Sequence, residues 1–242
     1  KVGEKHYPIN RVGIYVPGGN GPLISTVIMT VTIAKVAKVK EIVVVTPPDS
    51  DGKIAPQMLA ALDLLGVTEI YKVGGAQAVG ALAYGTKSIP AVDKIFGPGN
   101  AFVNEAKRQV YGIVGIDLLP GPSEIMVIAD SSSNPSFVAA ALLAQAEHGS
   151  GKEKIYLLFS EESQFDEISN EINLQLEQLS HKDAVTRVLR NGFIAVHLPS
   201  YQRMAEIANY IAPEHLELQV ANDHIDFFTS AITTAGAFLL GH

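Results

Sequence analysis

The sequence predicts an α/β protein of two adjacent parallel-sheet domains, each an incomplete Rossmann-like fold with helices on both faces. Three observations lead to this fold class. Short apolar segments rich in β-branched residues alternate with segments of helical periodicity, at intervals of roughly 25 to 30 residues in the first half of the chain. Most of the short segments end in a glycine or proline turn, as strands do before a helix begins. One of them, 41–46, is a continuous β-branched run, which is typical of a strand buried on both faces of a parallel sheet.

The first strand is expected at 11–16, because these residues are apolar and partly β-branched and end at Pro17-Gly18-Gly19. A helix should follow over 23–39. Its residues are apolar on much of the helix circumference, so we expect this helix to be covered on both sides. The next unit pairs the strand 41–46 with a helix over 54–65, where the apolar residues recur with a helical period.

Two further units complete the first half of the chain, each with a glycine turn between strand and helix. They comprise strands at 69–73 and 94–96, turns at Gly74-Gly75 and Gly97-Pro98-Gly99-Asn100, and helices at 76–84 and 101–111. The alternation resumes after Gly121 on the same grounds. There we expect strands at 124–129, 154–159 and 193–196, and helices at 135–147, 161–179 and 201–210.

The domain boundary is expected near residues 115–121, where Asp117-Leu-Leu-Pro-Gly-Pro122 interrupts the alternation. This gives one domain over residues 1–118 and a second over 119–242. No linker rich in serine or glycine separates them, so we expect the two halves to pack closely. Repeated strand–helix–strand units with right-handed connections then give each domain its parallel sheet.

Composition excludes several functional classes. A formal net charge of −7 without a Lys/Arg cluster argues against a nucleic-acid partner, so small molecules are expected instead. No apolar run reaches the 18 or so residues of a membrane span, and no signal peptide is present, so we expect a cytoplasmic protein without membrane contact. The chain has no cysteine, which removes disulfides, thiolate ligands and thiol nucleophiles. Calcium-loop, zinc-protease, Walker A and nucleophile-elbow motifs are also absent.

Three glycine turns lie at the carboxyl ends of expected strands, at 17–20, 74–77 and 97–100. In open α/β sheets this edge binds ligands, and glycine lets a helix N-terminus approach an anion such as a pyrophosphate. None of the turns has the Gly-x-Gly-x-x-Gly fingerprint, so a standard dinucleotide site is not supported. Tight strand–helix turns without a ligand explain them equally well.

Three side chains at this edge could contact a ligand. Tyr15, just before the first turn, could stack on an aromatic ring of a nucleotide, although a strand tyrosine more often packs in the core. Gln77 and Asn100 stand where their helices begin and could face a ligand. Capping of the helix is as good an explanation for Asn100.

Two pairs in the second half could carry chemistry. Gln145 and His148 stand three residues apart near the end of a helix, so an amide oxygen and an imidazole project from one face and could bind a zinc-like cation. A solvated or hydrogen-bonded pair is the more common arrangement. Glu214 and His215 follow Pro213 and begin an apolar, strand-like run. A carboxylate and an imidazole can shuttle protons if the backbone turns so that both face one substrate; otherwise they form a surface dipeptide.

Together these stretches resemble the histidinol dehydrogenase family over essentially the whole chain. The matching stretches are Val12–Gly19, Val73–Ala78, Val92–Val103, Gly121–Glu124, Leu143–Gly149 and Pro213–Leu216. The resemblance implies a zinc- and NAD-dependent enzyme of histidine biosynthesis. Such an enzyme oxidises L-histidinol to L-histidine through the aldehyde, by two hydride transfers, and works as a homodimer.

The resemblance also assigns roles to the residues. Residues 1–118 would bind NAD, through Tyr15, Gln77 and Asn100, and 119–242 would hold substrate and zinc. Gln145 and His148 would be zinc ligands close to the substrate, and Ser123 would help to hold it. His215 would be the general base, and Glu214 would activate the water that adds to the aldehyde.

The chain departs from the family at its two ends. The family has further residues before the first strand, and a carboxyl-terminal part with the other zinc ligands, one of them from the partner subunit. We therefore expect a core fragment with weak or no zinc binding, since zinc sites have about four ligands. The alternatives are a related dehydrogenase for another amino or sulfonated alcohol, and an inactive nucleotide-binding fragment.

Overall fold

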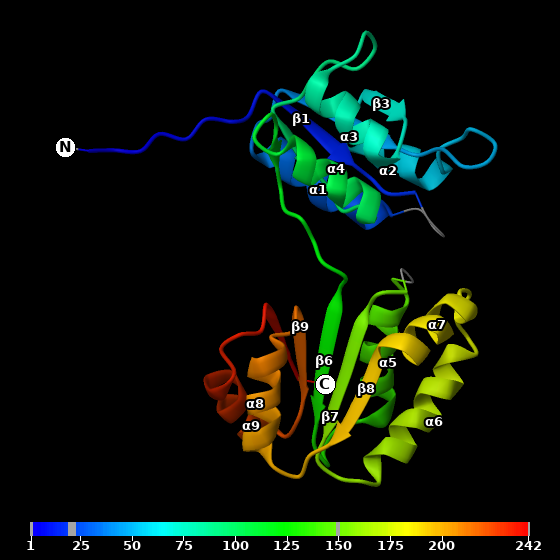
Figure 1. The fold of residues 1–242 in the computed structure, drawn as a ribbon, viewed down its shortest axis with the longest axis vertical. Coiled ribbons are helices and arrows are strands. Elements are labelled where there is room, and N and C mark those ends of the chain that lie inside the picture. Colours follow the sequence, from blue (N-terminus) through cyan, green and yellow to red (C-terminus); the bar gives the residue numbers. More distant parts are fainter. Residues whose placement is uncertain (1, 19–22, 149–150, 242) are drawn as a thin grey trace. The chain divides into compact units, whose positions relative to one another are not determined.

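The computed structural model describes residues 2–18, 23–148 and 151–241. The chain divides into two compact units, Lys1–Pro120 and Gly121–His242. Each unit is an α/β fold built on a five-stranded parallel sheet, in agreement with the fold class expected from the sequence (Figure 1). The expected turn residues Gly19 and Asn20, and Gly149, lie outside the described residues.

The sheet of unit 1 has the strand order β3-β2-β1-β4-β5. Its strands are β1 (Arg11–Tyr15), β2 (Glu41–Thr46), β3 (Glu69–Lys72), β4 (Lys94–Phe96) and β5 (Gly115–Ile116). Its helices are α1 (Ile24–Val36), α2 (Pro56–Leu64), α3 (Gly75–Tyr84) and α4 (Ala101–Val110). The first four strands match the expected ones, since each is a short segment with β-branched or aromatic residues before a turn.

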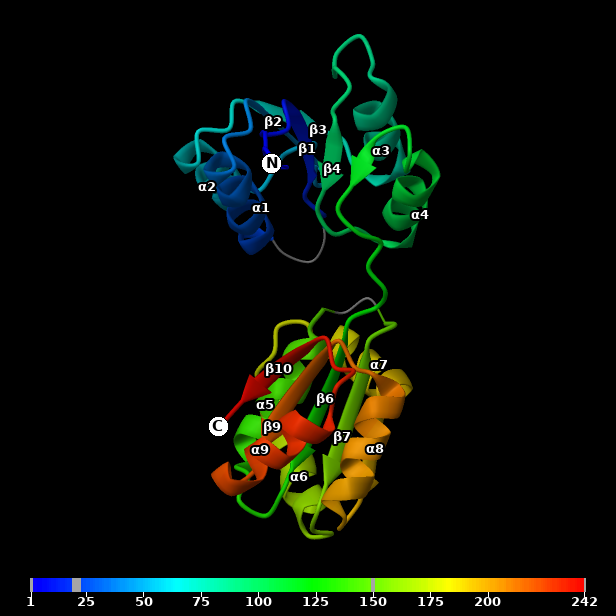
Figure 2. The ribbon, with the colours of Figure 1, turned by 90° about the vertical axis from the view of Figure 1, so that its left-hand side faces the viewer.

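Helices cover both faces of this sheet. Alternate residues of a strand point to opposite faces, so Ile14 and Val44 pack with α1 and α2, while Val43 and Val45 pack with α3 and α4. The view in Figure 2 separates the two helix pairs. Strand β1 lies between β2 and β4, whose following helices lie on opposite faces. The carboxyl ends of β1 and β4 therefore form the topological switch point, where ligands commonly bind in such sheets.

Helix α1 is covered on one side only within the described residues, so the expectation of cover on both sides was wrong for this part of the chain. Val27 and Val31 are its buried residues. The opposite stripe is apolar but exposed, with relative exposures of 66% at Met29, 69% at Ile33 and 77% at Val36. Apolar composition around a helix thus did not predict burial around it.

The sheet of unit 2 has the order β10-β9-β6-β7-β8, again all parallel. Its strands are β6 (Glu124–Ala129), β7 (Lys154–Phe159), β8 (Phe193–His197), β9 (His215–Gln219) and β10 (Ala237–Leu240). Its helices are α5 (Pro135–Ala146), α6 (Gln164–Leu176), α7 (Lys182–Gly192), α8 (Tyr201–Ile211) and α9 (Asn222–Ala231). Helices α5, α6 and α7 cover one face and α8 and α9 the other (Figure 1).

Four elements of the two units were not expected from the sequence. They are β5, α7, α9 and β10. Strand β5 is only two residues long and pairs with β4 at the sheet edge. Helix α7 is mostly polar and buries only Val185, Val188 and Gly192. Such short or mostly polar segments gain their structure from tertiary packing, which a single sequence does not display.

Candidate functional site

Tyr15 ends β1 at the switch point of unit 1, and its ring is buried. Its relative exposure is 3%, and it packs in the core beside α3 and α4. Its phenolic oxygen accepts a hydrogen bond of 3.0 Å from the backbone N–H of Gly75, in the first turn of α3. The ring therefore packs in the core and its hydroxyl fixes the start of α3 against β1. A contact of Tyr15 with a nucleotide stays a prediction.

Gln77 and Asn100 are both exposed at the same edge. Asn100 caps α4, since its Oδ1 accepts hydrogen bonds from the backbone N–H groups of Phe102 at 3.0 Å and Val103 at 3.1 Å. The capping role that the sequence left open is thus present. Capping uses the amide oxygen, and the amide nitrogen can still donate to a ligand. Gln77 lies in the first turn of α3, and its contact with a ligand stays a prediction.

The glycine turns at this edge serve packing. A Cβ added at Gly18 or at Gly74 would lie 2.5 Å from the ring of Pro47, which follows β2. Glycine at these two positions lets the ends of β1 and β3 approach β2. The glycines therefore do not by themselves indicate an anion site, as the absence of the dinucleotide fingerprint already suggested.

The candidate residues of unit 2 gather where the parallel strands of its sheet begin, and not at the carboxyl ends of these strands. Ser123 directly precedes β6, and His215 is the first residue of β9. Strands β6 and β9 are hydrogen-bonded neighbours, with Ile125 paired to His215. Helix α5 runs back from the end of β6, and its last turn leads through residues 147–153 to the start of β7. Gln145 and His148 therefore lie at this edge as well.

The chain turns sharply just before Glu214. Ala212 has a left-handed backbone with φ 52° and ψ 60° at the end of α8, and Pro213 follows. As a result the side chains of the two neighbours approach each other, with Nδ1 of His215 4.0 Å from a carboxylate oxygen of Glu214. The turn that both side chains require in order to face one substrate is present.

The peptide groups of Glu124 hold both side chains. Its N–H donates to Oε2 of Glu214 at 3.2 Å, and its carbonyl oxygen lies 3.3 Å from Nδ1 of His215. A carbonyl oxygen only accepts, so Nδ1 carries the proton and Nε2 is left as the basic nitrogen. The side chains remain accessible, with relative exposures of 53% for Glu214 and 42% for His215. An accessible carboxylate beside an accessible basic imidazole can transfer protons.

Gln145 and His148 touch each other at the end of α5. Nε2 of Gln145 lies 3.2 Å from Nδ1 of His148, and this Nδ1 is 3.1 Å from the backbone oxygen of Gln145. Gln145 is buried and His148 is exposed. Rotating the carboxamide by half a turn presents its oxygen where its nitrogen now lies, so the pair can offer one oxygen and one nitrogen to a cation. Within residues 2–18, 23–148 and 151–241, no cluster of three or more His, Cys, Asp or Glu side chains could hold a metal.

The carboxyl edge of unit 2 carries polar groups that the sequence did not single out. Asp130 follows β6, is 2% exposed, and accepts hydrogen bonds from Ala221 N–H at 2.9 Å and His224 Nδ1 at 3.0 Å. Burial on its own raises the pKa of Asp130, but hydrogen bonds from Ser132, Ala221 and His224 outweigh it and the pKa lies below its ordinary value. An aspartate directly after the apolar run 125–129 was the available sequence clue.

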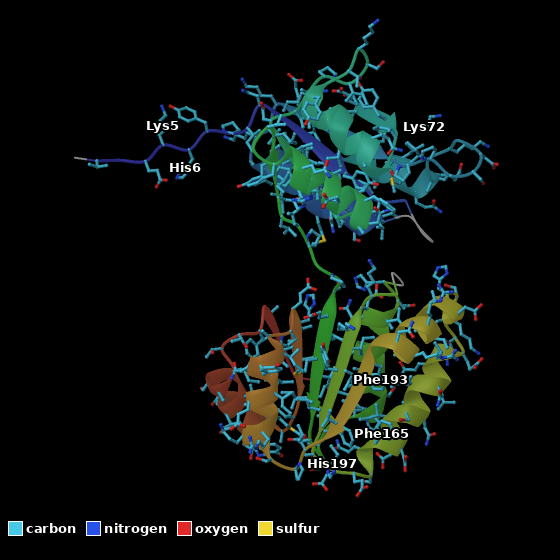
Figure 3. All side chains as sticks on the ribbon, in the orientation of Figure 1. Lys5, His6, Lys72, Phe165, Phe193 and His197 are labelled. Carbon is cyan, nitrogen blue, oxygen red and sulfur yellow. The ribbon has the colours of Figure 1, made fainter. Side chains whose placement is uncertain are left out.

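A hollow of about 410 Å³ lies at the same edge of unit 2. Its walls combine aromatic rings and carboxylates, and Phe165 and His197 both stack on Phe159. Figure 3 labels Phe165 and His197 at this end of the unit. The lining residues are Phe159, Glu162, Phe165, Asp166, Ala195 and His197.

Among the described helices, none is long and apolar enough to cross a membrane.

The fold defines the class of protein first. It is shared with an acetylating aldehyde dehydrogenase of Geobacillus thermoglucosidasius, with a TM-score of 0.62 and 15% identity over 97% of this chain and 65% of that one. At this identity only the fold is shared, and the present chain has no cysteine. The chain is thus a parallel α/β protein with the fold seen in dehydrogenases of aldehydes.

The family follows from closer matches. The family model described as histidinol dehydrogenase matches residues 1–242. A histidinol dehydrogenase of Clostridium acetobutylicum is 48% identical over 96% of this chain and 53% of its own length, and one of Listeria monocytogenes is 47% identical over 99% and 55%. The crystal structure of histidinol dehydrogenase from Elizabethkingia anophelis superposes with a TM-score of 0.89 at 43% identity, covering 98% of this chain and 54% of that one.

The chain belongs to the histidinol dehydrogenase family, as the sequence motifs indicated. It spans about half the length of the curated relatives that it matches.

Proposed function

We propose that the protein takes part in the NAD-dependent oxidation of L-histidinol to L-histidine, through the aldehyde, in the cytoplasm. The observation that carries this proposal is the pair at the start of β9, where Glu214 and His215 are both bonded to Glu124 and both exposed. Family membership supplies the substrate class. The reaction needs a base for the alcohol proton and a second group for water, and the pair offers both.

His215 takes the alcohol proton on Nε2 in the first step, as the carbon–hydrogen bond breaks. Its Nδ1–H keeps donating to the carbonyl oxygen of Glu124, which supports the imidazolium that forms. In the second step the carboxylate of Glu214 removes a proton from the water that adds to the aldehyde carbon, and the protonated His215 gives its proton to the aldehyde oxygen, which completes the hydrate and leaves His215 neutral again. His215 accepts the hydroxyl proton of the hydrate as the second carbon–hydrogen bond breaks. The acid is then released after both groups return their protons to solvent.

Two bound groups complete the proposal. NAD would accept the hydride in each oxidation, and the edge of unit 1 with Tyr15, Gln77 and Asn100 would hold it. Zinc would orient the substrate through its polar atoms, with Gln145 and His148 among its ligands and Ser123 near the substrate. The donor chemistry fits, since an imidazole nitrogen and an amide oxygen are within the range that zinc accepts. Two ligands fall short of the usual set of about four, so further donors must join them.

The test is the formation of NADH by the purified protein with L-histidinol, with and without added zinc. Turnover with L-histidinol, and none with an amino alcohol that lacks the imidazole, is the expected result. A chain that binds NAD and zinc but leaves histidinol unchanged would contradict the proposed activity. The homodimer is checked by sedimentation equilibrium, where the expected mass is twice that of the single chain.

A further inference from the structure

Lys107 is a fully buried charged side chain in unit 1 that the proposed reaction does not use. It lies on α4 and has a relative exposure of 0%. Its ammonium donates a hydrogen bond of 3.0 Å to the carbonyl oxygen of Gly97 and pairs with a carboxylate oxygen of Asp117. Taking an ammonium out of water is costly, so the bonds that compensate it fix its position. Since Nζ is enclosed, Lys107 is not placed to reach a phosphate itself.

Asp117, the partner of Lys107, binds the backbone N–H of Gly97. Its Oδ2 accepts a hydrogen bond of 2.7 Å from the N–H of Gly97, and its own N–H donates to the carbonyl oxygen of Ile95 at 3.0 Å. Oδ1, which pairs with Lys107, also accepts the N–H of Leu118 at 2.7 Å. Both backbone polar groups of Gly97 are therefore held by one ion pair.

Gly97 needs such support because of the conformation it adopts. Its φ is +114°, and a Cβ added there would lie 2.0 Å from the carbonyl oxygen of Tyr15. The residue turns the chain from β4 toward α4 directly over the end of β1. This is the switch point of the sheet, and three residues later Asn100 caps α4. A change in the backbone at Gly97 would move Asn100 relative to Tyr15.

We propose that the Lys107–Asp117 ion pair positions the turn 97–100 for a dinucleotide bound at this edge, and so sets the affinity for it. The inference rests on the proposed binding of NAD by unit 1. Lys107 and Asp117 are positioning residues, because they act through the backbone of Gly97 and do not touch the ligand. Without the pair, the turn samples other conformations, and NAD must select the competent one at a loss of affinity.

The test compares Lys107→Met with Arg11→Met. Arg11 is a matched control, since it also pairs with two carboxylates of the same sheet, those of Glu41 and Glu69, where the strands begin. Two quantities are measured for each protein: the hydrogen exchange of the Gly97 amide relative to amides of β2, and the dissociation constant of NAD. Asp117→Asn, which keeps the size of the side chain, serves if Lys107→Met does not fold.

In Lys107→Met we expect the Gly97 amide to exchange at least about tenfold faster and NAD to bind at least about tenfold more weakly. Arg11→Met should lower the thermal stability and leave both quantities near their original values. Unchanged exchange at Gly97 would overturn the positioning role, and so would faster exchange with unchanged NAD affinity. If the original protein itself fails to bind NAD, the proposed function fails, while the exchange data still decide whether the pair holds the turn.

Discussion

The carbonyl oxygen of Glu124 lies 3.3 Å from Nδ1 of His215, across the pairing of β6 with β9. This contact selects the tautomer whose proton sits on Nδ1, because a carbonyl oxygen can only accept. Nε2 is then free to accept a proton from a substrate. The same residue donates its N–H to Glu214 at 3.2 Å. One residue of β6 therefore orients both groups that the proposed reaction needs.

Replacing these groups should lower turnover without unfolding the protein. His215→Asn and Glu214→Gln each remove a proton acceptor from an exposed side chain, so we expect kcat for histidinol to fall by about 10² to 10⁴. The rate of NADH formation measures this. His197→Gln is the control, since His197 ends β8 at the other edge of the sheet, where its Nε2 is hydrogen-bonded to the backbone oxygen of Ser160. If His215→Asn forms NADH as fast as His197→Gln, His215 has no role in the reaction.

Zinc affinity should depend on Gln145 and His148. Each variant, Gln145→Ala or His148→Ala, removes one donor, and we expect the affinity to fall at least about tenfold, the loss seen even for groups that only support a ligand. Metal content after dialysis against buffered zinc measures it. His181→Ala is the control, because His181 is an exposed histidine before α7. If all three variants retain the same amount of zinc, Gln145 and His148 are not zinc ligands, and their contact is a simple hydrogen bond.

The strands at the centre of both sheets could be predicted because they are continuous β-branched or apolar runs. Helix α7 could not, since its single apolar stripe is buried only through packing against the cluster around α5 and β7. At the site, the spacing of Gln145 and His148 predicted their contact. The support of His215 by Glu124 could not be foreseen, because it joins residues 91 positions apart through a strand pairing that only the folded sheet defines.

Asp130 should make the stability of the protein depend on pH in the acidic range. Its folded-state pKa lies below the ordinary value. Burial disfavours the charged form and raises the pKa, but the hydrogen bonds from Ser132, Ala221 and His224 favour the charged form and outweigh burial. The charged carboxylate therefore stabilises the fold above about pH 4, and this contribution is lost as the pH falls through the folded pKa. Asp130→Asn should lower the free energy of unfolding by about 1 to 3 kcal/mol at pH 7, because buried donors lose their acceptor.

Urea unfolding at pH 7 and at stepwise lower pH checks this prediction. Asp223→Asn is the matched control, since Asp223 approaches the same His224 at 3.9 Å but its side chain is 80% exposed. The control should lose little stability and keep the pH dependence of the original protein. Equal losses in the two variants would mean that the buried network around Asp130 contributes no more than a surface carboxylate.

The turn after β4 should tolerate no side chain at Gly97. Gly97→Ala combines an unfavourable φ of +114° with a Cβ only 2.0 Å from the carbonyl oxygen of Tyr15, so a backbone shift is required. Gly112→Ala separates the two effects, because Gly112 has a φ of +97° and no atom within 4 Å of an added Cβ. We expect a loss of about 1 kcal/mol for Gly112→Ala from backbone strain alone, and more than about 3 kcal/mol for Gly97→Ala. Denaturant unfolding gives both values. Equal losses would show that strain alone matters and that the contact with Tyr15 relaxes without cost.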